Sequence, residues 1–195
     1  MNELVFLLEE ESAKSMLLGL LPRILGPQVQ PRLMVFEGKL DLGKQLMKRL
    51  RGYMNPQARF IVLRDQDNTP DCKVVKAKLL GLCAQAGRQA VSLVRIACHE
   101  LESFYLADLQ AVEVALGVTG LATRQSSARF RSADRVQSPS RELGKLIHGE
   151  YQKVSGSRLL GLHLDLANDR SASFKNLIAG VRRWEQELLA LRKAG

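Results

Sequence analysis

An apolar run meets two closely spaced acids in the stretch Phe60-Ile61-Val62-Leu63-Arg64-Asp65-Gln66-Asp67. A short unbroken run of branched and aromatic residues is typical of a β-strand that is buried on both faces. Two carboxylates so near each other repel, so their place at the end of a buried strand favours a site that binds a cation. Magnesium prefers hard oxygen ligands and keeps waters for a phosphate substrate, so Mg²⁺ is the ion that this stretch predicts.

Similar apolar runs recur along the first half of the chain, and segments with helical spacing separate them. The expected strands cover residues 4–8, 33–36, 60–63 and 91–97. One expected helix begins after Ser12 and a second after Gly38, and two more cover residues 71–86 and 100–116. Continuous apolar strands that alternate with amphipathic helices are typical of a parallel sheet covered on both faces. We therefore expect an α/β fold, with a Rossmann-like parallel sheet of about four strands flanked by helices.

The second half of the chain differs in composition from the first. Residues 118–141 hold five arginines against the single acid Asp134, and helical spacing returns around residues 142–151 and from Ser173 onward. We expect an α/β domain over residues 1–117, a basic loop over residues 118–141, and a helical C-terminal extension over residues 142–195 that packs on the same domain. The basic loop is either a solvated linker or a binding element, and the sequence leaves both interpretations open.

Acidic residues follow three of the four expected strands. They are Glu9, Glu10 and Glu11 after the first strand, Asp65 and Asp67 after the third, and Glu100 and Glu102 after the fourth. In open parallel sheets the functional crevice lies outside the carboxyl ends of the strands, so these acids are expected to converge. Glu100 and Glu102 point roughly 200° apart on a regular helix, which leaves room for only one of them to face the crevice.

The charge of the chain favours an anionic partner. Its 195 residues include 29 basic and 20 acidic side chains, a formal net charge of +9. Nucleic acid is the first candidate for such a partner, although an inert basic surface explains the charge equally well. Three cysteines without CxxC spacing, no long apolar stretch and no basic leader predict a cytoplasmic protein that does not enter a membrane.

A second phosphate-binding pattern occurs after the second expected strand. Residues 38–45, Gly-Lys-Leu-Asp-Leu-Gly-Lys-Gln, nearly match a P-loop, but Gln45 stands where Ser or Thr should coordinate Mg²⁺. A plain helix start is the alternative interpretation.

Together these motifs resemble an uncharacterised bacterial family with a Toprim-like fold, the domain of unknown function 4276 (DUF4276). The resemblance spans nearly the whole chain and is carried by the stretches Phe36-Glu37-Gly38-Lys39-Leu40-Asp41-Leu42, Arg64-Asp65-Gln66-Asp67-Asn68 and His99-Glu100-Leu101-Glu102. Toprim domains use a glutamate after the first strand and an Asp-x-Asp after the third to hold Mg²⁺ or Mn²⁺. The resemblance therefore implies Glu9, Asp65 and Asp67 as catalytic and metal-binding residues, with Glu100 or Glu102 as a further ligand and Lys153 near the phosphate.

The same resemblance implies a function. It suggests a metal-dependent nuclease that acts on nucleic acid, with a role in phage defence beside an ATPase partner. Separately from the resemblance, the apolar C-terminal helix offers a surface on which a homodimer could form. Glu10 stands where Toprim domains usually have glycine. Because this adds a negative charge near the metal, the alternative is a catalytically degenerate binding module or a partner subunit of an ATPase.

Overall fold

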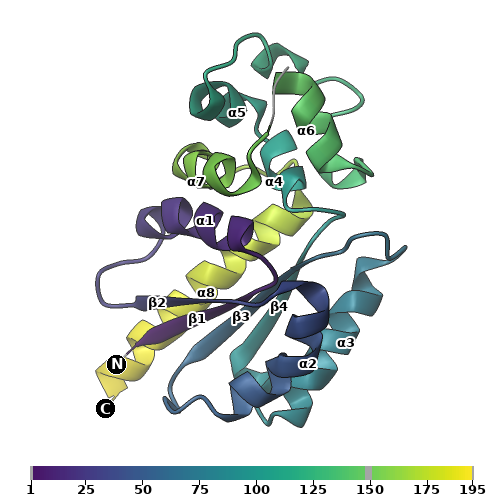
Figure 1. Cartoon of the computed structure of the whole chain (residues 1–195). Helices are drawn as coiled ribbons and strands as arrows, with labels where there is room; N and C mark the ends of the chain where they lie inside the picture. Colours follow the sequence, from purple (N-terminus) through teal and green to yellow (C-terminus); the bar gives the residue numbers. More distant parts are fainter. Residues whose placement is uncertain (1, 148–150, 195) are drawn as a thin grey trace.

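The computed structural model describes residues 2–147 and 151–194, with side chains up to residue 191. At its centre lies a parallel sheet, shown in Figure 1. Within the described residues the strands are β1 (Glu3–Leu8), β2 (Gln30–Val35), β3 (Arg59–Asp65) and β4 (Ser92–Ala97), in the order β2-β1-β3-β4. Every neighbouring pair is parallel. The predicted α/β fold with a four-stranded parallel sheet flanked by helices is confirmed.

Helices cover both faces of this sheet (Figure 1). The helices α2 (Gly38–Arg51) and α3 (Cys72–Gln85) lie on one face, and α1 (Glu11–Leu20) and α8 (Ala172–Ala194) lie on the other. Successive side chains of a strand point to opposite faces. Val5 and Leu7 of β1 therefore join the hydrophobic cluster of α2 and α3, whereas Phe6 joins that of α1 and α8.

The first residues of α2 and α3 show what the segments after β2 and β3 do. The helix α2 begins at Gly38, so residues 38–45 form helical turns and offer no loop that could wrap around a phosphate. At the start of α3, Oδ1 of Asp71 accepts a hydrogen bond of 2.8 Å from the N–H of Lys73. Asp71 is therefore a helix cap, as its position predicts.

The remaining α-helices of the described residues stand above the carboxyl ends of the strands in Figure 1. They are α4 (Glu102–Leu106), α5 (Leu109–Leu116), α6 (Pro139–Ile147) and α7 (Lys153–His163). The prediction of one helix over residues 100–116 is wrong, because Asp108 interrupts it. The side chain of Asp108 accepts hydrogen bonds from the N–H groups of Ala111 (3.1 Å) and Asp165 (2.7 Å), so it caps α5 and ties it to the end of α7.

The helices α1 and α7 cross at two glycines. A Cβ atom on Gly19 would lie 2.8 Å from the backbone of Gly161, and one on Gly161 would overlap the carbonyl oxygen of Met16. Only glycine permits so close an approach of two backbones. This crossing holds α7, and with it Lys153 at its first position, over the carboxyl edge of the sheet.

Residues 118–141 include two single turns of 3-10 helix, η3 (Ala122–Arg124) and η4 (Ala133–Arg135). The division of the chain at residues 117 and 141 stays a prediction. Residues from all three expected parts, such as Leu8, Phe130 and Trp184, share one hydrophobic cluster. In the part of the chain that the structure describes, we find no helix with the length and hydrophobicity that crossing a bilayer requires.

Candidate metal centre

The candidate site lies where β1, β3 and β4 end. Asp65 is the last residue of β3 and is paired with Ala97 of β4. Glu9 directly follows β1, and its N–H donates to the carbonyl oxygen of Leu63 in β3 at 3.3 Å. Because the strands are parallel and adjacent, acids that are distant in sequence reach the same edge of the sheet.

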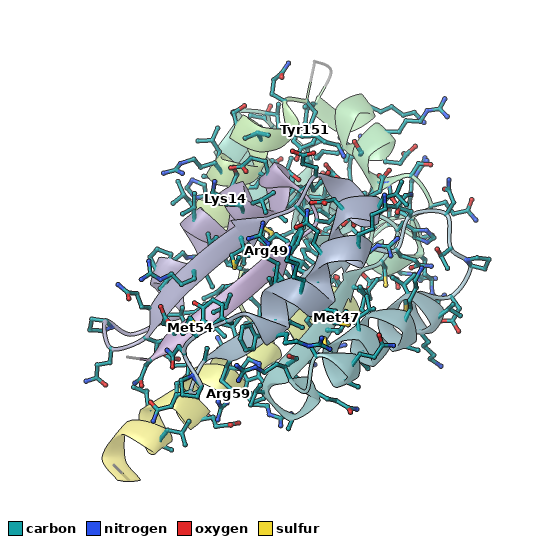
Figure 2. All side chains as sticks on the ribbon, turned by 60° about the horizontal axis from the view of Figure 1, so that its bottom comes forward. Lys14, Met47, Arg49, Met54, Arg59 and Tyr151 are labelled. Carbon is teal, nitrogen blue, oxygen red and sulfur yellow. The ribbon has the colours of Figure 1, made fainter. Side chains whose placement is uncertain are left out.

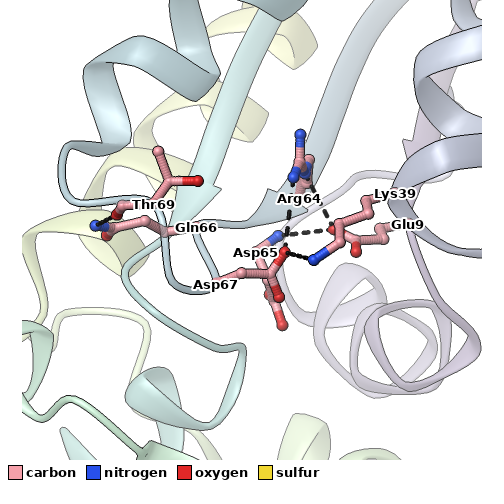
Figure 3. Close-up of polar contacts among 7 residues, drawn as sticks. All are labelled: Glu9, Lys39, Arg64, Asp65, Gln66, Asp67 and Thr69. Atoms are coloured by element: carbon pink, nitrogen blue, oxygen red, sulfur yellow. Dashed lines mark hydrogen bonds and ion pairs between the residues drawn. The ribbon is translucent and has the colours of Figure 1, made fainter.

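Glu9 and Asp67 belong to a network of ion pairs, drawn in Figure 3. Oε2 of Glu9 accepts a hydrogen bond of 3.2 Å from the N–H of Asp65 and lies 3.5 Å from Nε of Arg64. Oδ2 of Asp67 lies 2.9 Å from Nζ of Lys39 and 3.6 Å from the Arg64 guanidinium. Arg64 thus bridges the two acids, and Lys39, in the first turn of α2, contacts Asp67.

The turns after β3 and β4 carry strained backbone. Asp67 and His99 have φ values of 55° and 58°, in the left-handed region that costs a non-glycine residue roughly 1–2 kcal/mol. The N–H of Asp67 donates to the carbonyl oxygen of His99 at 2.8 Å, and the N–H of His99 donates to Oε1 of Gln66 at 3.3 Å. These bonds hold the two turns together and fix the direction in which the chain leaves each strand.

Asp65 has an environment that disfavours its charge. Burial, followed by the carboxylates of Glu10, Glu102 and Glu9, raises the pKa of Asp65 well above its ordinary value, and the N–H of Leu101 works in the opposite direction. Burial and the charge of Asp67 likewise raise the pKa of Glu9. Perturbed acids of this kind cluster at functional sites.

Glu102 is the most deeply buried acid of the group. It is 0% exposed, and neither of its carboxylate oxygens has a hydrogen-bond partner among the described residues. Its nearest cation is Nζ of Lys153, 3.8 Å from Oε1. Burial raises the pKa of Glu102, and Lys153 only partly offsets that effect. A buried carboxylate without hydrogen bonds is costly, so its presence calls for a ligand or a function.

Glu100 points away from this group. Its Oε2 accepts a hydrogen bond of 2.7 Å from the N–H of Ser140, in the first turn of α6. A carboxylate there satisfies a free N–H and interacts favourably with the helix dipole. Of the two glutamates between which the sequence left the choice open, Glu102 faces Asp65 and Lys153, and Glu100 caps a helix.

Lys153 faces the acids from the start of α7. Burial acts to lower its pKa, but the charges of Glu102, Glu10, Asp65 and Glu100 outweigh it and raise the pKa of Lys153. The ammonium group is therefore held in its charged form beside the acidic group. It can donate to an anionic oxygen placed between Glu102 and solvent.

Sequence reasoning missed three residues of this site as candidates. Glu10 was noted only for its charge, yet it adds to the pKa shifts of Asp65, Glu102 and Lys153, and the Ser12 hydroxyl donates to it. Tyr105 is fully buried beside Tyr151, whose pKa is raised by burial and by Glu102. Figure 2 shows Tyr151 at one end of the molecule and Arg59 at the other. The run of three glutamates could have signalled Glu10, but no pattern in the sequence signals the tyrosines.

The donor set suits a hard divalent cation in its chemistry, since it consists of carboxylate oxygens and includes the unpartnered Glu102. The spatial arrangement of these carboxylates is less suited to a metal ion. Among the described residues, no three His, Cys, Asp or Glu side chains are grouped closely enough to hold a metal ion as they stand. The ion pairs of Glu9 and Asp67 explain this, because Arg64 and Lys39 hold those two carboxylates. Binding a metal here requires these side chains to rearrange.

Comparison with known proteins supports the fold and identifies the family. The chain is similar in structure to the C-terminal region of the Burkholderia pseudomallei OLD protein, with a TM-score of 0.50 over 93% of this chain and 98% of that chain. The sequence identity is 15%, so this likeness concerns the fold alone. Comparison with curated proteins gives no match. The profile of the family "Domain of unknown function (DUF4276)" matches residues 8–182, nearly the whole chain, and the predicted resemblance to DUF4276 is thereby confirmed. The chain belongs to the DUF4276 family.

Proposed function

We propose that this protein is a metal-dependent phosphodiester hydrolase, a nuclease of Toprim type. The observation that carries the proposal is the position of Asp65, whose charge is disfavoured by Glu9 and Glu10 after β1 and by Glu102 at the start of α4. Such a concentration of acids at the carboxyl edge of a parallel sheet is typical of a site that binds Mg²⁺ or Mn²⁺ and acts on phosphate. The likeness in fold to part of an OLD protein is compatible with this role.

In the proposed mechanism Asp65, Glu102, Glu9 and Asp67 would hold the metal. A bound Mg²⁺ or Mn²⁺ would supply an activated water and neutralise charge on the phosphate. Lys153, whose ammonium group lies near Glu102, would donate to a non-bridging oxygen of that phosphate. Arg64, which bridges Glu9 and Asp67, would keep both acids near the edge of the sheet. The basic surface contributes affinity for the nucleic-acid backbone that weakens as salt increases.

Cleavage assays on DNA and RNA with Mg²⁺ or Mn²⁺ test this proposal. The double variant Asp65→Asn, Asp67→Asn should lose at least about 100-fold in cleavage rate, the scale of removing a charged group that acts in the transition state. The matched control is Asp71→Asn, which alters a nearby acid that only caps α3. Full activity in the double variant would refute the proposal.

A catalytically degenerate binding module is the second candidate. The ion pairs of Lys39 and Arg64 favour it, because they already neutralise Asp67 and Glu9, and Glu10 adds a further negative charge. Such a module could serve as the partner subunit of an ATPase in phage defence or form a homodimer through α8. Calorimetric titration with Mn²⁺ separates the two candidates, since only the enzyme requires saturable binding at millimolar metal.

A further inference from the structure

A pocket lined by arginines lies next to the candidate metal centre and has no part in the mechanism above. It has a volume of about 370 Å³, and its polar lining consists of Arg129, Arg135, Arg141, Gln137, Ser138 and Glu142. The lining comes from the end of the basic segment and from the first turns of α6. All three arginines are exposed to solvent.

The pocket has more positive charge than its own acid can neutralise. The Glu142 carboxylate lies 2.6 Å from the Arg129 guanidinium and 2.7 Å from Nζ of Lys145, and the charge of Arg141 also acts on it. Within the described residues, the guanidinium groups of Arg135 and Arg141 form no hydrogen bond and no salt bridge. Two guanidinium groups are therefore left to bind an anion from outside the chain.

The backbone that carries these arginines is anchored to the body of the protein. Asp134, next to Arg135, accepts hydrogen bonds from the N–H of Ser173 (2.9 Å) and from the hydroxyl groups of Ser171 (2.6 Å) and Ser173 (2.9 Å). The N–H of Ala133 donates to the carbonyl oxygen of Arg170 at 3.3 Å. An anchored backbone lowers the entropy that is lost on binding, so this segment has the features of a preorganised site.

Both ends of the pocket are attached to the segment that leads from β4 to Glu102. Ser140, beside Arg141, donates its N–H to Glu100. Ser173 donates hydrogen bonds to Asp134, and the hydroxyl oxygen of Ser173 accepts a hydrogen bond of 3.4 Å from the N–H of Cys98. The arginine pocket and the acids of the candidate metal centre thus lie on either side of residues 98–100.

We propose that the arginine pocket binds a phosphodiester group of a nucleic-acid strand that also reaches the metal centre. This inference rests on the proposed function, because that function brings a polynucleotide to the acids. The planar guanidinium group matches the oxygens of a phosphate in a bidentate manner, and two unpaired arginines supply the charge. Contacts of this type set the register of a strand and do not read its sequence.

The test measures binding apart from cleavage. Short fluorescein-labelled single strands of DNA and RNA are titrated with the full chain in EDTA at several KCl concentrations, and fluorescence anisotropy is followed. The double variant Arg135→Ala, Arg141→Ala should raise Kd by about tenfold and reduce the slope of log K against log salt by about 1. The charge-matched control is Lys48→Ala, Arg49→Ala, which removes two exposed cations from the last turn of α2, at the opposite edge of the sheet.

Each outcome decides the inference. A selective loss of affinity in the pocket variant supports it, whereas equal losses in both variants, or none, overturn it. If inorganic phosphate stabilises the wild type against heat more than the pocket variant while strand binding is unchanged, the pocket binds a free anion and the strand assignment is overturned. Arg135→Lys, Arg141→Lys retains the charge and should recover part of the affinity, which excludes misfolding as the cause.

The failure of this inference is distinguishable from that of the proposed function. If strand binding in EDTA depends on the arginines but no cleavage occurs in Mg²⁺ or Mn²⁺, the nuclease proposal is refuted and the pocket proposal stands. If the pocket variant binds and cleaves the strand with the Kd and rate of the wild type, the pocket proposal is refuted and the nuclease proposal stands.

Discussion

The backbone N–H of Asp65 donates a hydrogen bond of 3.2 Å to Oε2 of Glu9, although 56 positions separate the two residues in the chain. The bond joins the residue after β1 to the last residue of β3. It brings the first-strand glutamate to the same side of the molecule as the Asp65–Asp67 pair. The proposed metal centre depends on this relationship, because an ion could not be shared between acids on opposite sides of the sheet.

Glu102→Gln should stabilise the protein and abolish the proposed cleavage. Burial disfavours the charge of this carboxylate, and an uncharged amide of the same shape removes that penalty. The midpoint of thermal unfolding should rise by a few degrees, given that about 1 kcal/mol shifts it by about 2–4 °C for a chain of this size. The control is Glu100→Gln, which should lower the midpoint because it weakens the cap of α6 and should leave metal binding intact. A decrease in the midpoint for Glu102→Gln would contradict the assignment.

In the metal-free protein, the contribution of Glu102 to the free energy of unfolding should decrease as pH rises. The pKa of Glu102 in the folded state lies above its ordinary value of 4.5, so its contribution is fully present below that value and is lost as pH rises through the raised pKa. The free energy of unfolding of the wild type, relative to Glu102→Gln, should therefore fall as pH rises above 4.5. Denaturant titrations of both proteins in EDTA at several pH values measure the difference. A difference that does not change with pH would be evidence against a shifted Glu102.

Addition of Mg²⁺ or Mn²⁺ should stabilise the wild type at neutral pH. A ligand that binds only the folded state adds about 2.7 kcal/mol when its concentration is 100 times Kd. The effect should diminish at acidic pH, since Asp65 and Glu9 also have raised pKa values and protonated acids do not bind the ion. Thermal unfolding with and without each ion provides the measurement. The double variant Asp65→Asn, Asp67→Asn should show no such stabilisation.

Replacement of Lys153 by methionine should harm both stability and cleavage. The change leaves Glu102 without its nearest cation, but Lys153 is 44% exposed, so we expect a loss of only about 1 kcal/mol. In the double variant with Glu102→Gln this loss should largely disappear, because no buried charge remains to be compensated. The measurement is a double-mutant cycle that compares the free energies of unfolding of the wild type, the two single variants and the double variant. Additive effects of the two changes would show that Lys153 and Glu102 do not interact.

Gly161→Ala should destabilise the protein through the crossing of α1 and α7. Its methyl group would overlap the backbone of Met16, and overpacking of this kind costs typically about 1–3 kcal/mol. The matched control is Gly81→Ala in α3, where a Cβ atom meets no atom within 4 Å and alanine should stabilise the helix by about 0.5–1 kcal/mol. Chemical denaturation measures both changes. Since α7 carries Lys153, the Gly161 variant should also cleave more slowly than the control.

Local patterns were sufficient to predict the sheet. The apolar run at residues 60–63 lies within β3, and the run at residues 4–8 lies within β1, because a strand covered on both faces needs unbroken hydrophobicity. The interruption at Asp108 was not predictable from helical spacing. Leu106 and Leu109 both favour a continuous helix, and Asp108 instead caps α5 by accepting from the N–H of Ala111. The second bond to Asp108, from the N–H of Asp165, comes from far along the chain.

The sequence by itself determined the parallel sheet and the edge at which Glu9, Asp65 and Asp67 gather, because apolar runs define strands and parallel strands end together. The tertiary structure alone decided that Glu102 faces inward while Glu100 caps α6. Their directions depend on the turn at His99 and on the packing of α4 beneath α6. The crossing of α1 and α7 places Lys153 near Glu102. No local pattern contains this information, because the orientation of a short helix about its axis is set by the surfaces that it contacts.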